Sequence, residues 1–351
     1  MTIQIIGGVD THAATHCACA IDTTGRLIGI AEFPATSTGY AQLTRWLRSH
    51  GPLNAVGVEG TGAYGAGLAR HLHREHVTVI EAPRPDRRSR RNHGKSDAID
   101  AEAAARAVLA GTARAVPKRA DGPVEAVRAL RVARLGAIKA KTAAINTLRS
   151  TIITAPELLR TALPTVAGPN VIIDACARLR PDTTHLDDPA QAIKASLRSV
   201  ARRAQSLRAE IHLLDQQIGV LLAATAPSTL AVFAMGPDTT AALLVTIGDN
   251  PDRLRSEKAF AHLCGVAPIP ASSGKTNRHR LHRGGDRSAN RALHIAVVVR
   301  MRYCTKTRAY VERRTAEGLS KQEIIRCLKR YLAREIFRTL RADYAALTAA
   351  T

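Results

Sequence analysis

Four carboxylates in the first third of the chain could do chemistry together. Asp10 and Glu59 each end a short apolar run that predicts a buried strand. Asp97 and Asp100 open a later Ala-rich segment. A charge at the end of a buried strand is costly unless a partner neutralises it, and four neighbouring carboxylates would repel one another without bound cations. Their types and positions therefore predict a divalent-metal site.

The chemistry of such a site is phosphoryl transfer. Two Mg²⁺ ions held by Asp and Glu oxygens can clamp a scissile phosphate and stabilise both the attacking and the leaving oxygen. We therefore predict that these four carboxylates are catalytic and hold Mg²⁺, as two ions, with Mn²⁺ as the alternative. Asp97 and Asp100 are three residues apart and share one helix face. Acids also favour helix N-termini without binding metal, an alternative that stays open for Asp97.

A serine in the last third of the chain is a candidate nucleophile. Ser273 lies in a glycine-containing loop, and the nearby cations Lys275, Arg278 and Arg280 could hold a phosphodiester against its hydroxyl. A serine hydroxyl needs activation by a base or a metal, which His279 or the carboxylate site could supply. Taken by itself, Ser273 is better explained as an ordinary loop serine.

The charge of the chain indicates a polyanionic partner. The sequence holds 51 Lys and Arg against 29 Asp and Glu, a net charge of +22, which points most simply to nucleic acid. Two basic segments carry the predicted contacts: Arg87, Arg88, Arg90, Arg91 and Lys95 in the first, and Lys275, Arg278, Arg280 and Arg283 in the second. A solvated linker is the alternative for the first segment. An acidic membrane surface is the alternative partner, but no lipidation signal or membrane-active helix supports it.

The remaining bulk features favour a protein of the cytoplasm. The six cysteines form neither a C-x-x-C pair nor a zinc-finger spacing, which indicates reduced thiols. The first residues lack a signal-peptide pattern. No apolar run approaches the roughly 18 residues of a membrane span.

The order of the predicted elements indicates an α/β domain followed by helices. The predicted strands cover residues 3–9, 17–22, 27–33, 54–58 and 77–81, and the predicted helices between them cover 38–50 and 67–76. Three consecutive strands followed by alternating helices and strands predict a mixed sheet with helices on both faces. This order matches the ribonuclease-H-like (RuvC-like) fold, in which the first and fourth strands are neighbours. Asp10 and Glu59 would then lie side by side.

The rest of the chain is predicted to be mostly helical, with domains at 1–115, 116–225 and 226–351. A long helix is expected over 124–152, and after a Pro- and Asp-rich interval an apolar seam runs without a break from Ile193 to Leu221. Its alternating spacing of four and three predicts a coiled coil, which could pair with the long helix, with a second subunit, or with both. A helix–turn–helix pattern near Ala234 is similar to a helix-hairpin-helix, although the usual first glycine is replaced by that alanine.

Several short motifs together resemble a known family. They cover residues 8–10, 57–64, 95–101, 260–268, 272–274 and 290–293. The chain resembles the insertion-sequence transposases that join an N-terminal RuvC-like DEDD domain to a C-terminal serine transposase domain, the bridge-RNA-guided DNA recombinases. The resemblance places the family's acidic tetrad on the four carboxylates named above. It places the nucleophile on Ser273, with the adjacent Ser272 as the alternative.

The resemblance implies a covalent mechanism and three kinds of partner. The serine would attack a DNA phosphate and form a 5′-phosphoserine link, and a structured RNA would pair with donor and target DNA. The protein would assemble as a homodimer or homotetramer. Two other functions are weighed against this one: a RuvC-like nuclease or junction resolvase with water as nucleophile, and a non-catalytic nucleic-acid scaffold. An actin-like sugar kinase is disfavoured, because the duplicated core and nucleotide loops are missing.

Overall fold

The structure is a computed structural model that describes residues 4–83, 96–164, 166–250, 252, 255–274 and 279–349. The chain forms two compact units. The first comprises Met1–Glu125 with Ile247–Arg255, and the second comprises Ala126–Thr246 with Ser256–Thr351. The predicted boundaries after residues 115 and 225 stay a prediction.

The first unit is built on a five-stranded mixed sheet in the order β3-β2-β1-β4-β5. The strands are β1 (Ile5–Thr11), β2 (Thr15–Asp22), β3 (Leu27–Pro34), β4 (Leu53–Glu59) and β5 (Thr78–Ala82). The first three pair antiparallel, whereas β1 with β4 and β4 with β5 pair parallel. The first and fourth strands are therefore neighbours, as predicted, and the mixed sheet is consistent with a ribonuclease-H-like fold.

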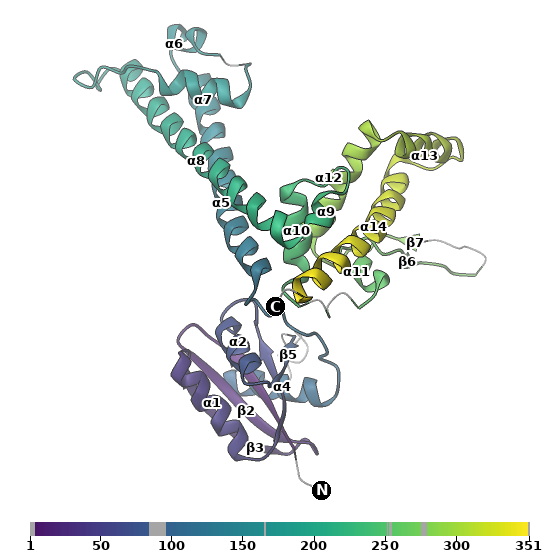
Figure 1. Cartoon of the computed structure of the whole chain (residues 1–351). Coiled ribbons are helices and arrows are strands. Elements are labelled where there is room, and N and C mark those ends of the chain that lie inside the picture. Colours follow the sequence, from purple (N-terminus) through teal and green to yellow (C-terminus); the bar gives the residue numbers. More distant parts are fainter. Residues whose placement is uncertain are drawn as a thin grey trace. The chain divides into compact units, whose positions relative to one another are not determined.

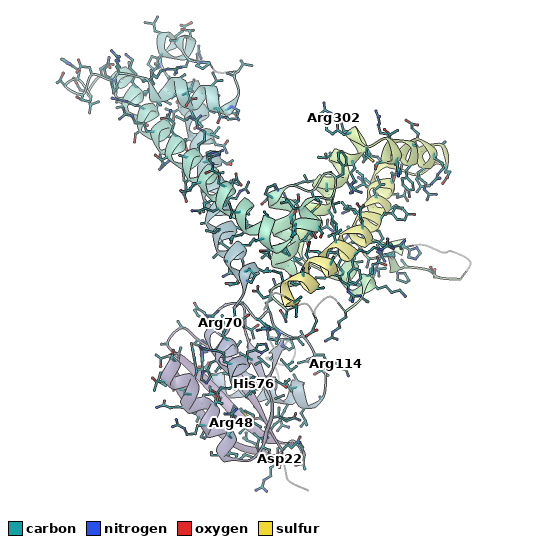
Figure 2. All side chains as sticks on the ribbon, in the orientation of Figure 1. Asp22, Arg48, Arg70, His76, Arg114 and Arg302 are labelled. Atoms are coloured by element: carbon teal, nitrogen blue, oxygen red, sulfur yellow. The ribbon has the colours of Figure 1, made fainter. Side chains whose placement is uncertain are left out.

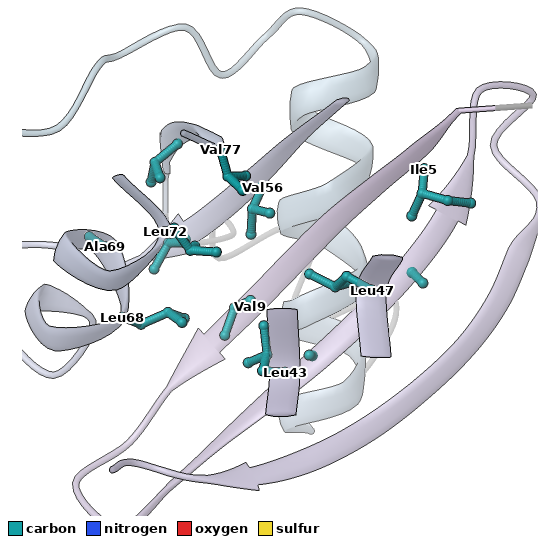
Figure 3. Close-up of a cluster of buried hydrophobic side chains, with 13 residues drawn as sticks. Ile5, Val9, Leu43, Leu47, Val56, Leu68, Ala69, Leu72 and Val77 are labelled. Atoms are coloured by element: carbon teal, nitrogen blue, oxygen red, sulfur yellow. The ribbon is translucent and has the colours of Figure 1, made fainter. Parts of the chain in front are cut away.

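Helices cover both faces of this sheet. Helices α1 (Ser37–Ser49) and α2 (Ala66–Arg74) lie on one face, and α4 (Asp97–Leu109) lies on the other. Figure 3 shows the first face, where Leu43 and Leu47 of α1 and Leu72 of α2 pack on the strand residues. Alternation along each strand sends successive side chains to opposite faces, so one strand supplies both cores.

Two glycines allow α4 to lie unusually close to the sheet. Gly8 of β1 and Gly57 of β4 are paired across the parallel ladder. A Cβ atom at Gly8 would lie 2.1 Å from the Ala101 carbonyl oxygen, and one at Gly57 would lie 2.7 Å from the Ala104 carbonyl oxygen. The helix backbone thus fills the space that side chains would need. This contact fixes α4, and with it the acidic residues at its start, against the strands.

The second unit begins with two long helices that run beside each other (Figure 1). These are α5 (Pro123–Ile153) and α8 (Pro189–Thr225), and the short helices α6 (Glu157–Ala162) and α7 (Pro169–Ala177) lie between them in sequence. Leu197 of α8 packs with Leu148 of α5 and Ile172 of α7 in one buried cluster. Part of the predicted apolar seam therefore faces the chain's own core, and the coiled coil stays a prediction.

The C-terminal part of this unit is helical with one short hairpin. It contains α9 (Pro227–Leu230), α10 (Pro237–Ile247), α11 (Glu257–Leu263), β6 (Ile269–Pro270), β7 (His279–Arg280), α12 (Arg287–Tyr303), α13 (Thr305–Ala316) and α14 (Lys321–Ala349). A capping box starts α14, because the Ser320 amide donates to Glu323 and the Glu323 amide donates to Ser320 Oγ. Within the described ranges, no helix is long and apolar enough to cross a membrane.

Exposed cations are spread over both units. Arg48, His76 and Arg114 are exposed on the first unit, and Arg302 is exposed near the end of α12 in the second (Figure 2). All six cysteines are free thiols, as predicted. Burial raises the pKa of Cys17 to about 11 and that of Cys19 to about 12, which keeps both thiols protonated at neutral pH.

Candidate active site

The parallel pairing of β1 and β4 brings two predicted acids to neighbouring strand ends. Val9 pairs with Val58, so Asp10 and Glu59 are the next residues on adjacent strands. Side chains alternate along a strand, so Asp10 and Glu59 point to the same face of the sheet as Gly8 and Gly57. That face packs against α4. The hydroxyl of Thr11 donates to the Glu59 carbonyl oxygen at 2.9 Å and ties the two strand ends together.

The start of α4 brings the other two acids to the same face. Ser96 caps the helix, and its hydroxyl accepts from the Ile99 amide at 3.3 Å, as its position predicted. Asp100 is buried at 6% exposure, whereas Asp97, one turn earlier, is exposed. The helix N-terminus favours negative charge at both positions, but it does not require that Asp100 be buried.

A histidine joins this cluster. His12 Nε2 lies 3.2 Å from Asp10 Oδ2 and 3.2 Å from Asp97 Oδ1. Ligand atoms of these three residues all lie within 4.8 Å of one another, close enough to share a metal ion. Glu59 is half-buried at the adjacent strand end and its ligand atoms are not part of this three-residue group.

The electrostatics of the cluster favour a bound cation. Burial raises the pKa of Asp10, and the neighbouring charges of Asp100 and Asp97 raise it further, against the opposing effect of His12. Burial lowers the pKa of His12, but Asp10 and Asp97 outweigh it, so the net shift is upward. When His12 is protonated, its imidazolium compensates the neighbouring carboxylates. Oxygen-rich acidic sets with an imidazole suit Mg²⁺ or Mn²⁺, so the donor set fits the predicted metal.

Sequence reasoning missed His12, although a signal was present. Asp10 and His12 are two residues apart, the spacing that puts side chains on one side of an extended strand. The strand β1 ends at Thr11, so His12 follows it directly. An Asp-x-His pattern at the end of a buried strand would have been sufficient to include the histidine in the candidate set.

Ser273 lies in the second unit, in the loop that follows β6. It is exposed, as is the preceding Ser272, and Gly274 after it has a φ of 54°, the left-handed region that glycine tolerates best. β6 pairs with β7 through Ile269 with Arg280, so the serine belongs to a short hairpin.

The predicted nucleic-acid contacts fall in two groups. Arg280 and Arg283 are exposed beside this hairpin. The others lie outside the described residues: Arg87, Arg88, Arg90, Arg91, Lys95, Lys275 and Arg278.

Family comparisons match both parts of the chain. Residues 7–154 match a family model described as Transposase, for the DEDD domain of IS110 elements, and residues 230–312 match one described as Transposase IS116/IS110/IS902 family. Two separate parts of the chain are therefore similar to transposase domains of the IS110 type. The first match contains the four predicted carboxylates and His12, and the second contains Ser273.

A curated relative supports the same assignment. The "Insertion element IS110 uncharacterized 43.6 kDa protein" of Streptomyces coelicolor is 32% identical over 166 residues, which is 46% of this chain. The match spans 38% of that relative's own length. The chain therefore matches less than half the length of this insertion-element relative.

Proposed function

We propose that the chain is the DNA transposase of an insertion sequence and that it cleaves and rejoins DNA through a covalent serine link. The observation that carries this proposal is the convergence of Asp10, Asp97 and Asp100 on one face of an IS110-type DEDD domain, beside the strand end of Glu59. The second IS110-type domain supplies an exposed serine in a basic, hairpin-borne loop.

The acidic site would hold the metal and align the phosphate. Asp10, Glu59, Asp97 and Asp100 are the proposed ligands, with His12 within reach of Asp10 and Asp97. Divalent ions held there would supply charge neutralisation and Lewis-acid activation at a scissile phosphate. The carboxylates themselves fix the position of that phosphate relative to the sheet, because β1, β4 and the close-packed α4 are rigid elements.

The serine would carry out the bond exchange. Ser273 Oγ attacks the phosphorus atom, the bond from phosphorus to the 3′ oxygen breaks, and the 5′ phosphate stays on the serine. The hydroxyl proton passes to a base, for which His279 on β7 is the candidate in the same hairpin, and the departing 3′ oxygen takes up a proton. Reversal with a different 3′ hydroxyl rejoins the strand, so the phosphodiester bond energy is conserved.

Two further elements of the proposal concern partners. A structured RNA encoded by the element would pair with donor and target DNA and supply the choice of sequence, as the family resemblance implies. A homodimer or homotetramer would bring several active sites together, with the predicted coiled-coil seam of α8 as the contact. The charge of +22 suits both nucleic acids.

Matched variants test the division of labour between the two domains. We expect Ser273→Ala and Asp10→Asn each to abolish strand exchange while both variants still bind DNA. Each substitution removes one reactive group and leaves the fold of the other unit unchanged. Strand exchange on a plasmid that carries the element ends is the readout. DNA cleavage without rejoining by Ser273→Ala, with Asp10→Asn inactive, would instead indicate a RuvC-like nuclease that uses water.

A further inference from the structure

The C-terminal unit contains a cavity of its own. Its volume is about 580 Å³, and it lies between the loop after α11, the strand β7 and the first turns of α14. Its lining combines the apolar residues Pro268, Leu281 and Tyr331 with the cations Arg280, Arg326 and Lys329, and it also includes Glu323, which is bonded to Ser320 in the capping box. The cavity is at the base of the hairpin whose loop carries Ser273.

Lys329 is the unusual residue of this cavity. It is only 8% exposed, and its Nζ donates to Asn290 Oδ1 at 3.0 Å. Among the residues that the structure describes, no carboxylate forms an ion pair with it. Burying an ammonium group without a counter-charge is costly, so packing alone does not explain a lysine at this position.

Asn290 holds the lysine in place. Its amide Nδ2 donates to the carbonyl oxygens of Cys264 at 3.0 Å and Gly265 at 2.9 Å, which fixes Oδ1 toward Lys329. Burial lowers the pKa of Lys329, and the nearby charge of Arg326 lowers it further. An anion in the cavity would reverse both effects.

Other polar groups of the wall also lack partners. His282 lines the cavity, and its buried Nδ1 has no hydrogen-bond partner in the described part of the chain. Arg326 and Arg280 are exposed at the rim and make no ion pair with another described residue. Arg330 is different, because it is bridged to Glu257. Several hydrogen-bond donors on the cavity wall therefore have no partner among the described residues.

We infer that this cavity binds a phosphodiester group of a nucleic-acid backbone, with Lys329 and Arg326 as its cationic contacts and His282 as an additional donor. The inference rests on the proposed function, because it assumes that the hairpin loop acts on a DNA strand. A phosphate is the anion that several converging cations select, and the apolar wall accommodates the attached sugar. A strand held there would be anchored within a few residues of Ser273, so the cavity would position the backbone for attack.

Charge-removing variants test this inference on the full chain. Lys329→Met keeps the length of the side chain, and Arg326→Gln changes an exposed rim residue that the fold does not need. We expect each to weaken binding of a DNA duplex by about tenfold and to reduce the slope of log affinity against log salt by about 0.9. The control is Arg338→Gln, which removes one exposed cation from α14 outside the cavity and should change the affinity less than about twofold.

The melting temperature of the free protein separates this role from a structural one. If Lys329 serves binding, the melting temperature of Lys329→Met should be no lower than that of the parent, because an apolar side chain replaces a buried charge. The inference is overturned if Lys329→Met lowers the melting temperature and Arg326→Gln binds DNA like Arg338→Gln. Parallel titrations with duplex RNA decide which backbone the cavity takes. Failure of the parent itself to bind either nucleic acid would contradict the proposed function, whereas unchanged binding by both cavity variants contradicts only this inference.

Discussion

At the scale of single residues, the acidic site is a set of charges that need a cation. Asp10 is buried and its pKa is raised, mainly by burial and then by Asp100 and Asp97. In the metal-free chain, His12 lies between Asp10 and Asp97 and supplies the compensating proton. A metal ion and that proton therefore compete for the same place.

This competition predicts a pH dependence of metal binding. The His12 pKa is raised in the folded chain. Protonated His12 therefore stabilises the metal-free fold fully below the ordinary histidine pKa of about 6.5, and this stabilisation is lost as the pH rises through the raised value. Mn²⁺ affinity should accordingly increase with pH over that interval, by about tenfold per unit below the His12 pKa. Calorimetric titration with Mn²⁺ at a series of pH values measures it.

A histidine variant provides the control for that titration. His12→Asn removes the competing proton and keeps a polar side chain, so its Mn²⁺ affinity should depend less on pH than that of the parent. Identical pH profiles for the two proteins would show that His12 is not coupled to the metal site.

At the scale of elements, the site depends on how closely α4 approaches the sheet. A methyl group at residue 8 would meet the Ala101 carbonyl oxygen at 2.1 Å, a contact that only movement of the helix can relieve. We expect Gly8→Ala to destabilise the chain by about 1–3 kcal/mol and to weaken Mn²⁺ binding, because Asp97 and Asp100 move with α4. Urea unfolding and Mn²⁺ titration report the two effects.

A glycine elsewhere in the same sheet supplies the comparison. Gly29 of β3 would place a methyl group 3.4 Å from the Trp46 ring, which is ordinary contact. Gly29→Ala should leave both the unfolding midpoint and the Mn²⁺ affinity close to those of the parent. If Gly8→Ala behaved like Gly29→Ala, the close approach of α4 would not be what positions the acids.

A second element-scale prediction concerns the turn before α10. Ala234 has a φ of 69°, the left-handed conformation in which the usual helix-hairpin-helix has glycine. A non-glycine residue there costs about 1–2 kcal/mol, so Ala234→Gly should stabilise the chain by about 1 kcal/mol in thermal or urea unfolding. Ala231→Gly is the control, because Ala231 has a right-handed φ of −74° and glycine there should not stabilise. A lower midpoint for Ala234→Gly would show that this turn is not strained.

Much of this element structure could be predicted from local sequence. The strands that end at Asp10 and Glu59 are short apolar runs, and Ser96, Ser256 and Ser320 begin helices through caps that local spacing predicts. These signals depend on neighbours within about one turn, so one sequence is sufficient to detect them.

Other elements depend on contacts that local sequence does not show. The interval from 156 to 189 contains α6 and α7, whose buried apolar residues share one cluster with residues of α5 and α8. Lys329 looks like an ordinary surface lysine of an amphipathic helix, but it is buried and its ammonium group donates to Asn290, which is distant in sequence. His12 lay two residues from a recognised acid, but its role follows from the position of Asp97 on another element.

At the scale of the whole molecule, the net charge of +22 predicts strong electrostatic binding to nucleic acid. Each phosphate contact should contribute a slope of about −0.9 to a plot of log affinity against log salt, so several contacts give a steep line. Fluorescence anisotropy with a labelled duplex between low and physiological salt measures it. A nearly flat line would contradict the assignment of the basic segments as the contact surface.

The proposed strand exchange draws on chemical groups from both units. The first unit holds the carboxylates and the second holds Ser273, and neither has the complete set of groups that strand exchange needs. The charge, the carboxylate cluster and the family matches are each consistent with other nucleic-acid enzymes. The covalent serine link is the feature that distinguishes a serine recombinase from a nuclease.

The most direct test is therefore the identity of the protein–DNA bond. Parent protein is incubated with Mg²⁺, the guide RNA and a DNA substrate whose nick prevents rejoining, then denatured and digested for mass spectrometry. The account predicts a phosphodiester-linked nucleotide on the peptide that contains Ser273, and no adduct for Ser273→Ala or Asp10→Asn. Cleaved DNA with free 5′ phosphates and no protein adduct in the parent reaction would contradict it.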